Sequence, residues 1–348
     1  MNIDFLLIGH GLAGSVLGYR LKQSGKTIRI IDEPQRNQSS KVAAGLYNPI
    51  TGRKMVKTWN ADKLFPEIKP LYQNLEELTG LSFLIEKNIY RPFLSFEELN
   101  EWMGKSAEES FEPYIERIFD HSQSAFINDP YGGVLLKNCG WLKINELLKG
   151  MENYFKEEIL FQHFDESKLQ RKDDKWEYEG FRAKSIVFCN GLGAMNSSFF
   201  SYLPFAPVKG EILEVKQDFA PEFVLNRGVF RVGLGEGLFR VGSTYTKDDL
   251  DQGATDRGRE ELLRRLGELV NEPTKKIVSH KFGIRPATRD RKPFLGKHPA
   301  VDNVYSFNGF GAKGVSLIPY LSKIFVKLIL EGEPLPKEVD IARYFKYI

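Results

Sequence analysis

The sequence predicts an α/β fold in which a first domain on a parallel sheet is interleaved with an α+β second domain on a mostly antiparallel sheet. The first observation is the start of the chain: Asp4–Ile8 is a compact apolar run, Leu12–Ser24 has apolar residues at helical spacing, and Thr27–Ile31 is apolar and β-branched. This strand, helix, strand order is typical of a parallel sheet. The second observation is a group of alternating segments joined by glycine-rich turns, as in antiparallel sheets. These segments are Val208–Lys216, Phe223–Gly233 and Gly237–Tyr245.

The composition is that of an ordinary soluble globular protein of about two domains, at a typical ~150 residues per domain. The 348 residues are 42% hydrophobic and 27% charged, which excludes a disordered, collagen-like or coiled-coil chain. The formal net charge of +3 is too small to indicate a dedicated nucleic-acid or membrane-surface protein. No run of about 18 apolar residues occurs, so we expect no membrane span.

The cysteines and the N-terminus bear on location. Cys139 and Cys189 form no Cys-x-x-Cys pair and have no histidine at ligand spacing. We therefore expect neither a disulfide framework nor a metal site, and a cytoplasmic location. The stretch Phe5–Ala13 follows Asp4 rather than a basic residue and is rich in glycine, which predicts a strand and a turn rather than a signal peptide.

The middle of the chain predicts a long helix and then a separate substructure. The helix covers Ala61–Leu78 and stops at Gly80, although Pro66 and Pro70 weaken its first half. The substructure has a strand at Phe83–Tyr90, a short helix at Phe96–Met103 and a turn at 129–133.

Beyond this point the first domain resumes. The later elements are a helix at Ile144–Phe155, strands at Ile159–Phe164 and Lys184–Cys189, a helix at Asp256–Val270, a strand at Lys276–Gly283 and a final helix at Gly314–Leu330. The first domain is therefore assigned to residues 1–80, 136–208 and 282–348, and the second to residues 81–135 and 209–281.

A Gly-x-Gly-x-x-Gly pattern follows the first strand and opens the first helix, which is the context of a dinucleotide-binding fingerprint. Gly9 permits the tight turn, Gly11 lets the backbone approach a pyrophosphate, and Gly14 allows close packing of helix on strand. Leu12 and Ala13 lie between them, where the free N–H groups at the start of a helix favour an anion.

Two acidic residues end the second strand. Asp32 stands 23 residues after Gly9, near the ~20-residue spacing expected of a carboxylate that binds a ribose hydroxyl. Glu33 is a further candidate for cofactor contact, although a solvated strand end explains it as well. The carboxylate argues against a 2′-phosphate, and the pattern by itself does not separate NAD from FAD.

Segments spread over nearly the whole chain together resemble the D-amino-acid oxidase superfamily of FAD enzymes, particularly its glycine oxidase and sarcosine oxidase branch. The most specific is Gly283–Thr288, Gly-Ile-Arg-Pro-Ala-Thr, which is similar to the family's Gly-x-Arg-Pro-x-Thr motif. The other segments are Ala43–Pro49, Val187–Gly191, Pro207–Glu211 and Asn308–Gly314. The resemblance implies a Rossmann-type FAD-binding domain interleaved with a substrate domain.

The resemblance also assigns cofactor contacts. Ala43, Ala44 and Gly45 belong to the stretch beside the flavin ring, and Asn190 and Gly191 to the turn that closes on the cofactor. Because neither cysteine matches the one that carries covalent flavin in some sarcosine oxidases, we expect non-covalent FAD.

The loop before the final helix is a second possible anion site. Its residues are Gly309, Gly311, Ala312, Lys313 and Gly314. Free backbone N–H groups there could meet the N1 and O2 edge of a flavin, while a plain helix lead-in is the alternative. Ala312 stands where the branch tends to have a second arginine, which weakens the case for simple glycine or sarcosine as the substrate.

Arg285 is the predicted substrate anchor. It precedes Pro286, which holds the chain extended, and its planar guanidinium matches a carboxylate with two parallel hydrogen bonds. The resemblance gives the arginine of this motif that role; an ion pair with Asp290 is the alternative. Tyr245 ends a strand of the second domain and could line the pocket or the core.

The resemblance predicts an oxidoreductase that takes a hydride from an amino acid or N-substituted glycine to flavin N5, after which water hydrolyses the imine. The alternative is a tRNA-modifying enzyme acting on carboxymethylaminomethyl-uridine, because Leu46–Pro49 is similar to the flavin-side stretch of that FAD domain. Residues 257–297 hold 12 lysines and arginines against 5 acidic residues, which fits either a basic pocket or a basic surface. We favour the small substrate; a non-catalytic flavin protein would have no need of Arg285. The oligomeric state and the electron acceptor are not predicted.

Overall fold

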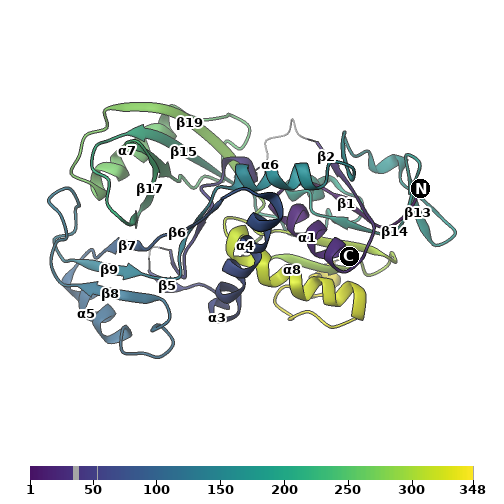
Figure 1. Cartoon of the computed structure of the whole chain (residues 1–348), viewed down its shortest axis with the longest axis horizontal. Helices are drawn as coiled ribbons and strands as arrows, with labels where there is room; N and C mark the ends of the chain where they lie inside the picture. Colours follow the sequence, from purple (N-terminus) through teal and green to yellow (C-terminus); the bar gives the residue numbers. More distant parts are fainter. Residues whose placement is uncertain (34–38, 53, 348) are drawn as a thin grey trace.

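The computed structural model describes residues 1–33, 39–52 and 54–347. Within these ranges two eight-stranded sheets dominate, and they lie at opposite ends of the molecule (Figure 1). The helices α4 (Ile68–Thr79) and α6 (Ile144–Tyr154) are drawn between them. The molecule is therefore built of two sheet layers with helices packed mainly on one of them.

The first sheet contains the N-terminal strand. Its members are β1 (Asn2–Ile8), β2 (Ile28–Asp32), β11 (Ile159–Phe161), β12 (Gln170–Lys172), β13 (Lys175–Tyr178), β14 (Phe181–Phe188), β20 (Phe294–Lys297) and β21 (Val304–Asn308). β1 pairs in parallel with β2 and β14, β2 with β11, and β14 with β21. Because β14 is long, its first half pairs with β13 and its second half with β21.

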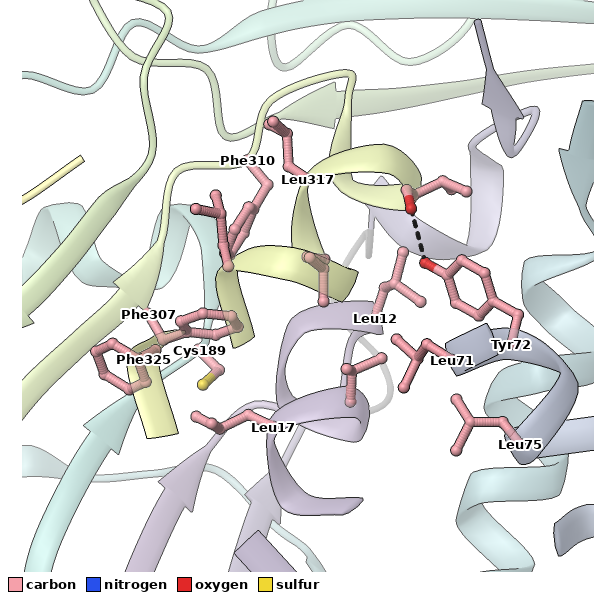
Figure 2. Close-up of a cluster of buried hydrophobic side chains, with 14 of the residues drawn as sticks. Leu12, Leu17, Leu71, Tyr72, Leu75, Cys189, Phe307, Phe310, Leu317 and Phe325 are labelled. Atoms are coloured by element: carbon pink, nitrogen blue, oxygen red, sulfur yellow. Dashed lines mark hydrogen bonds between the residues drawn. The ribbon is translucent and has the colours of Figure 1, made fainter. Parts of the chain in front are cut away.

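Alternation along β1 divides the core around this sheet. Phe5 and Leu7 pack in the cluster that holds the helices, whereas Leu6 and Ile8 pack in the cluster on the other side, as a period of two requires. The helices on the first face are α1 (Leu12–Gln23), α3 (Ala61–Leu64), α4, α6 and α8 (Gly314–Glu331). Tyr72 of α4 donates to Val315 O at 2.9 Å, a bond that fixes the start of α8. It is the dashed line from the Tyr72 hydroxyl in Figure 2.

The second sheet has the order β19-β15-β18-β17-β16-β7-β9-β8. Its strands are β7 (Ile89–Pro92), β8 (Ile115–Phe119), β9 (Gly133–Leu136), β15 (Val208–Lys216), β16 (Val224–Arg227), β17 (Val229–Gly235), β18 (Leu238–Gly242) and β19 (Lys276–Arg285). All pairs are antiparallel except β7 with β16. The helices α5 (Phe96–Lys105) and α7 (Asp256–Leu269) belong to this part. The predicted mostly antiparallel sheet is confirmed.

Short elements join the two parts. A small sheet combines β3 (Leu46–Tyr47), β6 (Leu84–Glu86) and β10 (Gly140–Leu142), and a hairpin pairs β4 (Ile50–Thr51) with β5 (Val56–Lys57). The remaining pieces are α2 (Ser39–Val42) and the 3₁₀ turns η1 (Phe65–Glu67), η2 (Glu166–Lys168), η3 (Gly191–Asn196) and η4 (Ile341–Tyr347).

Three predicted elements are wrong in detail. The helix over Ala61–Leu78 is broken at Pro66 into α3, η1 and α4, while Pro70 is tolerated in the first turn of α4, where its missing N–H would have no partner. The strand at Phe83–Tyr90 is two strands, β6 and β7, in different sheets. The segment Phe223–Gly233 contains a hairpin, since Gly228 turns the chain between β16 and β17 with a φ of 73°.

The predicted α/β class is confirmed, and the two sheets draw their strands from alternating stretches of the chain. The domain ranges given above stay a prediction. In the described ranges no helix is long and apolar enough to cross a membrane. No group of three or more His, Cys, Asp or Glu side chains in that part of the chain could hold a metal ion.

Candidate active site

One cavity of about 1520 Å³ runs from the first sheet to the second. Its walls include the carboxyl ends of β1, β2, β14 and β21, which is where open α/β sheets bind ligands. Drug-sized ligands occupy pockets of about 300–1,000 Å³, so this cavity has room for a dinucleotide and a substrate together.

At the first-sheet end, the turn after β1 depends on glycine. Gly9 has a φ of +104°, and a Cβ there would lie 2.8 Å from Cys189 O. A Cβ on Gly14 would lie 1.9 Å from Gly9 O, so helix α1 can pack on the turn only without a side chain. The turn thus has the close backbone approach that the fingerprint predicts.

Asp32 lies beside this turn at the end of β2. Its carboxylate is 8% exposed, lines the cavity, and accepts a hydrogen bond from His10 N at 2.8 Å. A carboxylate has about four acceptor sites, so one that is already hydrogen-bonded can also accept from a ligand hydroxyl. Leu12 N donates to Ser40 Oγ at 3.3 Å, which brings the segment after β2 to the start of α1.

His10, within the fingerprint turn, is not among the residues that line the cavity. Its ring packs edge-on to Phe155 at 5.9 Å, and Nε2 has no hydrogen-bond partner in the described ranges. Burial lowers the pKa of His10 to about 4, against the opposing effect of Asp32 and with a smaller contribution from Lys41. The imidazole is therefore neutral at pH 7.

Charge is unevenly distributed along the cavity. Acidic residues gather at the fingerprint end, and six cations gather at the end near the second sheet. The acids are Asp32, Glu33, Asp165 and Glu166; the cations are Arg91, Arg227, Arg264, Arg265, Arg285 and Lys313. His163 contacts Glu33 at 3.1 Å, and Glu268 accompanies the cations through a pair with Arg264. An anionic group of a ligand is thus favoured at the second-sheet end.

The loop before α8 differs from the prediction in one respect. Three of its N–H groups expected to be free are occupied, because Gly309 N donates to Asn308 Oδ1 at 2.8 Å, Gly311 N to Pro286 O at 3.2 Å and Lys313 N to Phe310 O at 3.1 Å. The amide groups of Phe310 and Ala312 have no acceptor within the described ranges. The Gly311 bond holds the loop against the Pro286 segment, and the amides of Phe310 and Ala312 are among those left for a ligand.

Arg285 ends β19 at the second-sheet end of the cavity. Its Nη2 donates to Ser243 Oγ at 2.6 Å and to Thr244 O at 3.3 Å, and its Nη1 donates to Lys209 O at 3.3 Å. No carboxylate lies within 4.0 Å of the guanidinium in the described part of the chain. Burial lowers the pKa of Arg285 from its ordinary value, so the positive charge there is poorly solvated.

The alternative ion pair of Arg285 with Asp290 is wrong. Asp290 instead accepts from Arg343 Nε at 2.9 Å. Tyr245 lines the cavity but is 62% exposed, with the guanidinium of Arg285 5.9 Å from its ring centre. The core position considered for Tyr245 is therefore excluded.

Of the predicted site residues, all but two line the cavity. The predicted residues that line the cavity are Gly9, Gly11, Leu12, Ala13, Asp32, Glu33, Ala43, Ala44, Gly45, Asn190, Gly191, Tyr245, Arg285, Gly311, Ala312, Lys313 and Gly314. Gly14 and Gly309 lie behind the wall: a Cβ on Gly309 would come within 2.8 Å of Thr288 Cγ2. These two glycines serve packing.

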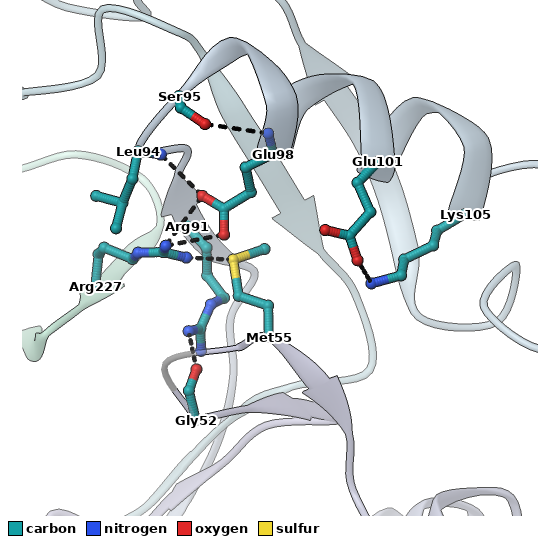
Figure 3. A network of polar contacts seen from close by, with 9 residues as sticks. All are labelled: Gly52, Met55, Arg91, Leu94, Ser95, Glu98, Glu101, Lys105 and Arg227. Carbon is teal, nitrogen blue, oxygen red and sulfur yellow. Dashed lines mark hydrogen bonds and ion pairs between the residues drawn. The ribbon is translucent and has the colours of Figure 1, made fainter.

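Two arginines near the second-sheet end of the cavity were not predicted as site residues from the sequence. Arg91, on β7, is 3% exposed and donates to Ile50 O and Gly52 O at 3.0 and 2.9 Å. Arg227 pairs with both oxygens of Glu98, and both arginines are shown in Figure 3. Neither belongs to a recognisable motif: Arg227 lies inside the predicted segment Phe223–Gly233, and Arg91 directly follows the predicted strand Phe83–Tyr90.

The comparisons with known proteins agree with this geometry. A family model described as FAD dependent oxidoreductase matches residues 4–328. The glycine oxidase of Pseudomonas aeruginosa is 30% identical over 145 residues, 41% of this chain and 39% of that protein. The tRNA 5-methylaminomethyl-2-thiouridine biosynthesis bifunctional protein MnmC of Leptospira borgpetersenii is 24% identical over 399 positions, 96% of this chain and 58% of that protein.

This chain thus spans less than two thirds of the length of these relatives. Among solved structures, glycine oxidase from Geobacillus kaustophilus has a TM-score of 0.74 at 20% identity, covering 99% of this chain and 98% of that one. The fold, the fingerprint turn and the family match over most of the chain lead to one assignment. The chain belongs to the FAD dependent oxidoreductase family, and its cofactor is FAD.

Proposed function

We propose that this enzyme oxidises the C–N bond of an amino acid or N-substituted glycine whose carboxylate is held by Arg285. When bound, FAD supplies the acceptor for a hydride at its N5. The α C–H bond breaks, a C=N bond forms, the amine proton leaves to solvent, and water hydrolyses the imine. Dioxygen or an electron carrier then takes two electrons from the reduced flavin and restores FAD.

The observation that carries the proposal is the state of Arg285. Its guanidinium is held by neutral oxygens on Ser243, Thr244 and Lys209, which orient it without neutralising it. The guanidinium is half-buried and oriented, and it has no carboxylate partner in the described ranges. A substrate carboxylate that binds it therefore displaces little more than water, because there is no ion pair to break. The chain's contribution to catalysis would then be orientation of the reacting carbon.

The fingerprint end would hold the other end of the cofactor. Gly11, Leu12 and Ala13 would face the pyrophosphate at the start of α1, and Asp32 would accept from a ribose hydroxyl. At the ring end, the segments with Ala43–Gly45, Asn190–Gly191 and Gly311–Gly314 would surround the flavin.

The test is the visible spectrum of the purified, FAD-loaded protein, followed by anaerobic bleaching with a series of N-substituted glycines. We expect bleaching by at least one carboxymethylamine and much slower bleaching by the corresponding amine without a carboxylate. Equal rates for both members of each pair would rule out the carboxylate requirement.

A second candidate is oxidation of the carboxymethylaminomethyl group of a tRNA uridine. It is favoured by the cavity's cationic end, which includes Arg264 and Arg265, and by the similarity to MnmC over nearly the whole chain. Arg285 would hold the same carboxymethylamine in both cases.

The two candidates differ in their response to nucleic acid. A tRNA substrate predicts binding of bulk tRNA that weakens steeply with salt, because each neutralised phosphate releases counterions. No detectable tRNA binding at low salt, together with bleaching by a small carboxymethylamine, would leave the small substrate.

A further inference from the structure

The second-sheet end of the cavity, which the proposed function makes the substrate end, contains more positive charge than one carboxylate can neutralise. Three of its cations, Arg91, Arg285 and Lys313, have no carboxylate within 4.0 Å in the part of the chain that the structure describes. The other cations there are paired. The pairs are Arg227 with Glu98, Arg264 with Glu268 and Arg265 with Glu261.

Two of the three unneutralised cations converge on strand β4. Lys313 Nζ donates to Thr51 Oγ1 at 3.1 Å, while Arg91 donates to the carbonyls that flank Thr51, those of Ile50 and Gly52. Figure 3 shows the Arg91 guanidinium against Gly52. The Thr51 hydroxyl, the Lys313 ammonium and the Arg91 guanidinium therefore lie close together in the cavity wall, and the two cations have only neutral hydrogen-bond acceptors there.

The third cation is close in the fold. Gly311 N donates to Pro286 O at 3.2 Å, so the segment with Lys313 lies directly against the segment with Arg285. Both side chains line the same cavity. A ligand that reaches Arg285 thus also comes near Lys313.

The surroundings of Lys313 have an excess of positive charge. Burial lowers the pKa of this lysine, and Lys292 and Arg291 lower it further. A half-buried ammonium with a single neutral acceptor is costly unless an anion joins it. A lysine ammonium has three donors, and Thr51 takes one of them.

We propose that the substrate has a second anionic group, which binds the Lys313 ammonium beside Thr51 while Arg285 holds the first carboxylate. The identification of that first group rests on the proposed function. The second group is a carboxylate or a phosphate, as in a dicarboxylic secondary amine or a phosphate-bearing carboxymethylamine.

Inert ethers test this without turnover. Methoxyacetate and diglycolate replace the amine of a monocarboxylic and a dicarboxylic substrate by oxygen, and neither can be oxidised at nitrogen. Their dissociation constants are measured on the FAD-loaded, oxidised protein from the change in the flavin spectrum. We expect diglycolate to bind at least ~10-fold more tightly, as for one added charge-assisted hydrogen bond.

A phosphate arm distinguishes the two sources of the second charge. 2-Phosphoglycolate is compared with diglycolate under the same conditions. Tighter binding of 2-phosphoglycolate assigns a phosphate, and tighter binding of diglycolate assigns a carboxylate. Failure of both to exceed the affinity of methoxyacetate overturns the proposal.

Variants locate the effect. Lys313→Met should remove most of the preference for diglycolate and leave methoxyacetate little changed, while Lys313→Arg should retain much of it. Lys292→Met is the matched control, because Lys292 lies over the Trp59 ring at 3.9 Å and does not line the cavity. If Lys292→Met and Lys313→Met lose the diglycolate preference equally, the preference comes from the general positive charge of this region and not from a binding site at Lys313.

Two further outcomes overturn the assignment. One is that Lys313→Met loses its FAD, as judged from spectrum and cofactor content, while Lys313→Arg keeps its FAD but binds diglycolate no more tightly than methoxyacetate. The other is that Lys313→Met shifts the flavin midpoint potential but leaves the preference for diglycolate over methoxyacetate unchanged. That result would place the Lys313 ammonium against the flavin rather than against the ligand. Neither outcome touches the proposed function, which fails instead if no carboxymethylamine bleaches the flavin.

Discussion

Arg285 Nη2 donates to Ser243 Oγ at 2.6 Å, which joins the end of β19 to the segment that follows β18. β15 lies between these two strands in the sheet, and its Gly210 makes the approach possible. A Cβ on Gly210 would lie 1.9 Å from the same Nη2 and 2.4 Å from Cζ of Arg285. The position of the guanidinium therefore depends on a hydroxyl group on one side and on a missing side chain on the other.

This relationship predicts the effect of Gly210→Ala. The methyl group collides with the end of a flexible side chain, so Arg285 turns aside and the fold is retained. We expect substrate-dependent flavin reduction to fall by ~10²-fold, which is typical of a ~1 Å misplacement, with the FAD content unchanged. Rapid mixing under anaerobic conditions measures the rate.

Gly267→Ala is the control for Gly210→Ala. Gly267 lies in α7, and a methyl group added there would have no other atom within 4 Å. Alanine at this position should therefore only strengthen the helix, by about 0.5–1 kcal/mol. If both variants reduce the flavin at the wild-type rate, Gly210 has no part in placing Arg285.

Arg285→Lys tests the carboxylate anchor directly. Lysine keeps the charge but loses the two parallel donors, so the reacting carbon is no longer held in place. Flavin reduction by a carboxymethylamine should fall by ~10²-fold, while reduction by an amine without a carboxylate should change little. Flavin bleaching after rapid mixing gives both rates, and equal losses for the two substrates would mean that Arg285 only shapes the pocket.

Asp32→Ala should weaken FAD binding. Loss of charge-assisted hydrogen bonds to a ribose hydroxyl costs roughly 1–3 kcal/mol, or about 5- to 150-fold in the dissociation constant. Titration of flavin-free protein with FAD, followed by flavin fluorescence, measures it. Glu33→Ala provides the comparison with a smaller expected effect, because the Glu33 carboxylate is already in contact with His163. If Asp32→Ala binds FAD with wild-type affinity, Asp32 does not contribute to FAD binding.

His10 predicts a pH dependence of stability. The side chain is 4% exposed, and burial lowers its pKa from 6.5 to about 4 in the folded protein. Between these values the unfolded chain binds a proton that the folded chain does not, so stability is lost as the pH falls from about 6.5 towards 4. The loss reaches about 3 kcal/mol at the lower end.

Urea unfolding of wild type and His10→Gln at several pH values, with protein and FAD concentrations fixed, measures this contribution. The stability difference between the two proteins should shift in favour of His10→Gln as the pH falls below 6.5, because glutamine does not titrate. Parallel pH profiles would show that His10 does not carry the effect.

Local patterns in the sequence were sufficient for much of the fold and for the fingerprint end of the cavity. The turn at Gly9, the start of α1 and Asp32 lie within one strand, helix, strand unit, where spacing along the chain determines spacing in space. The antiparallel second sheet was also predictable, because alternation and glycine turns are local signals. The sequence also indicated that Pro66 would disturb the helix, but it did not indicate whether the helix would kink or end there.

The substrate end was decided by the tertiary structure. Arg285 could be recognised from its motif, but not its contact with Ser243, 42 residues away in the sequence, or the need for glycine at position 210. Arg91 and Lys313 converge on Thr51 from strands and loops far apart in the chain. Such convergence depends on long-range pairing between strands and on packing of whole elements, and no periodicity in a single stretch of sequence encodes it. The sequence alone determined the cofactor family and pointed to Arg285 as the proposed substrate anchor. The packing of two sheets against one cavity determined the charge that surrounds Arg285.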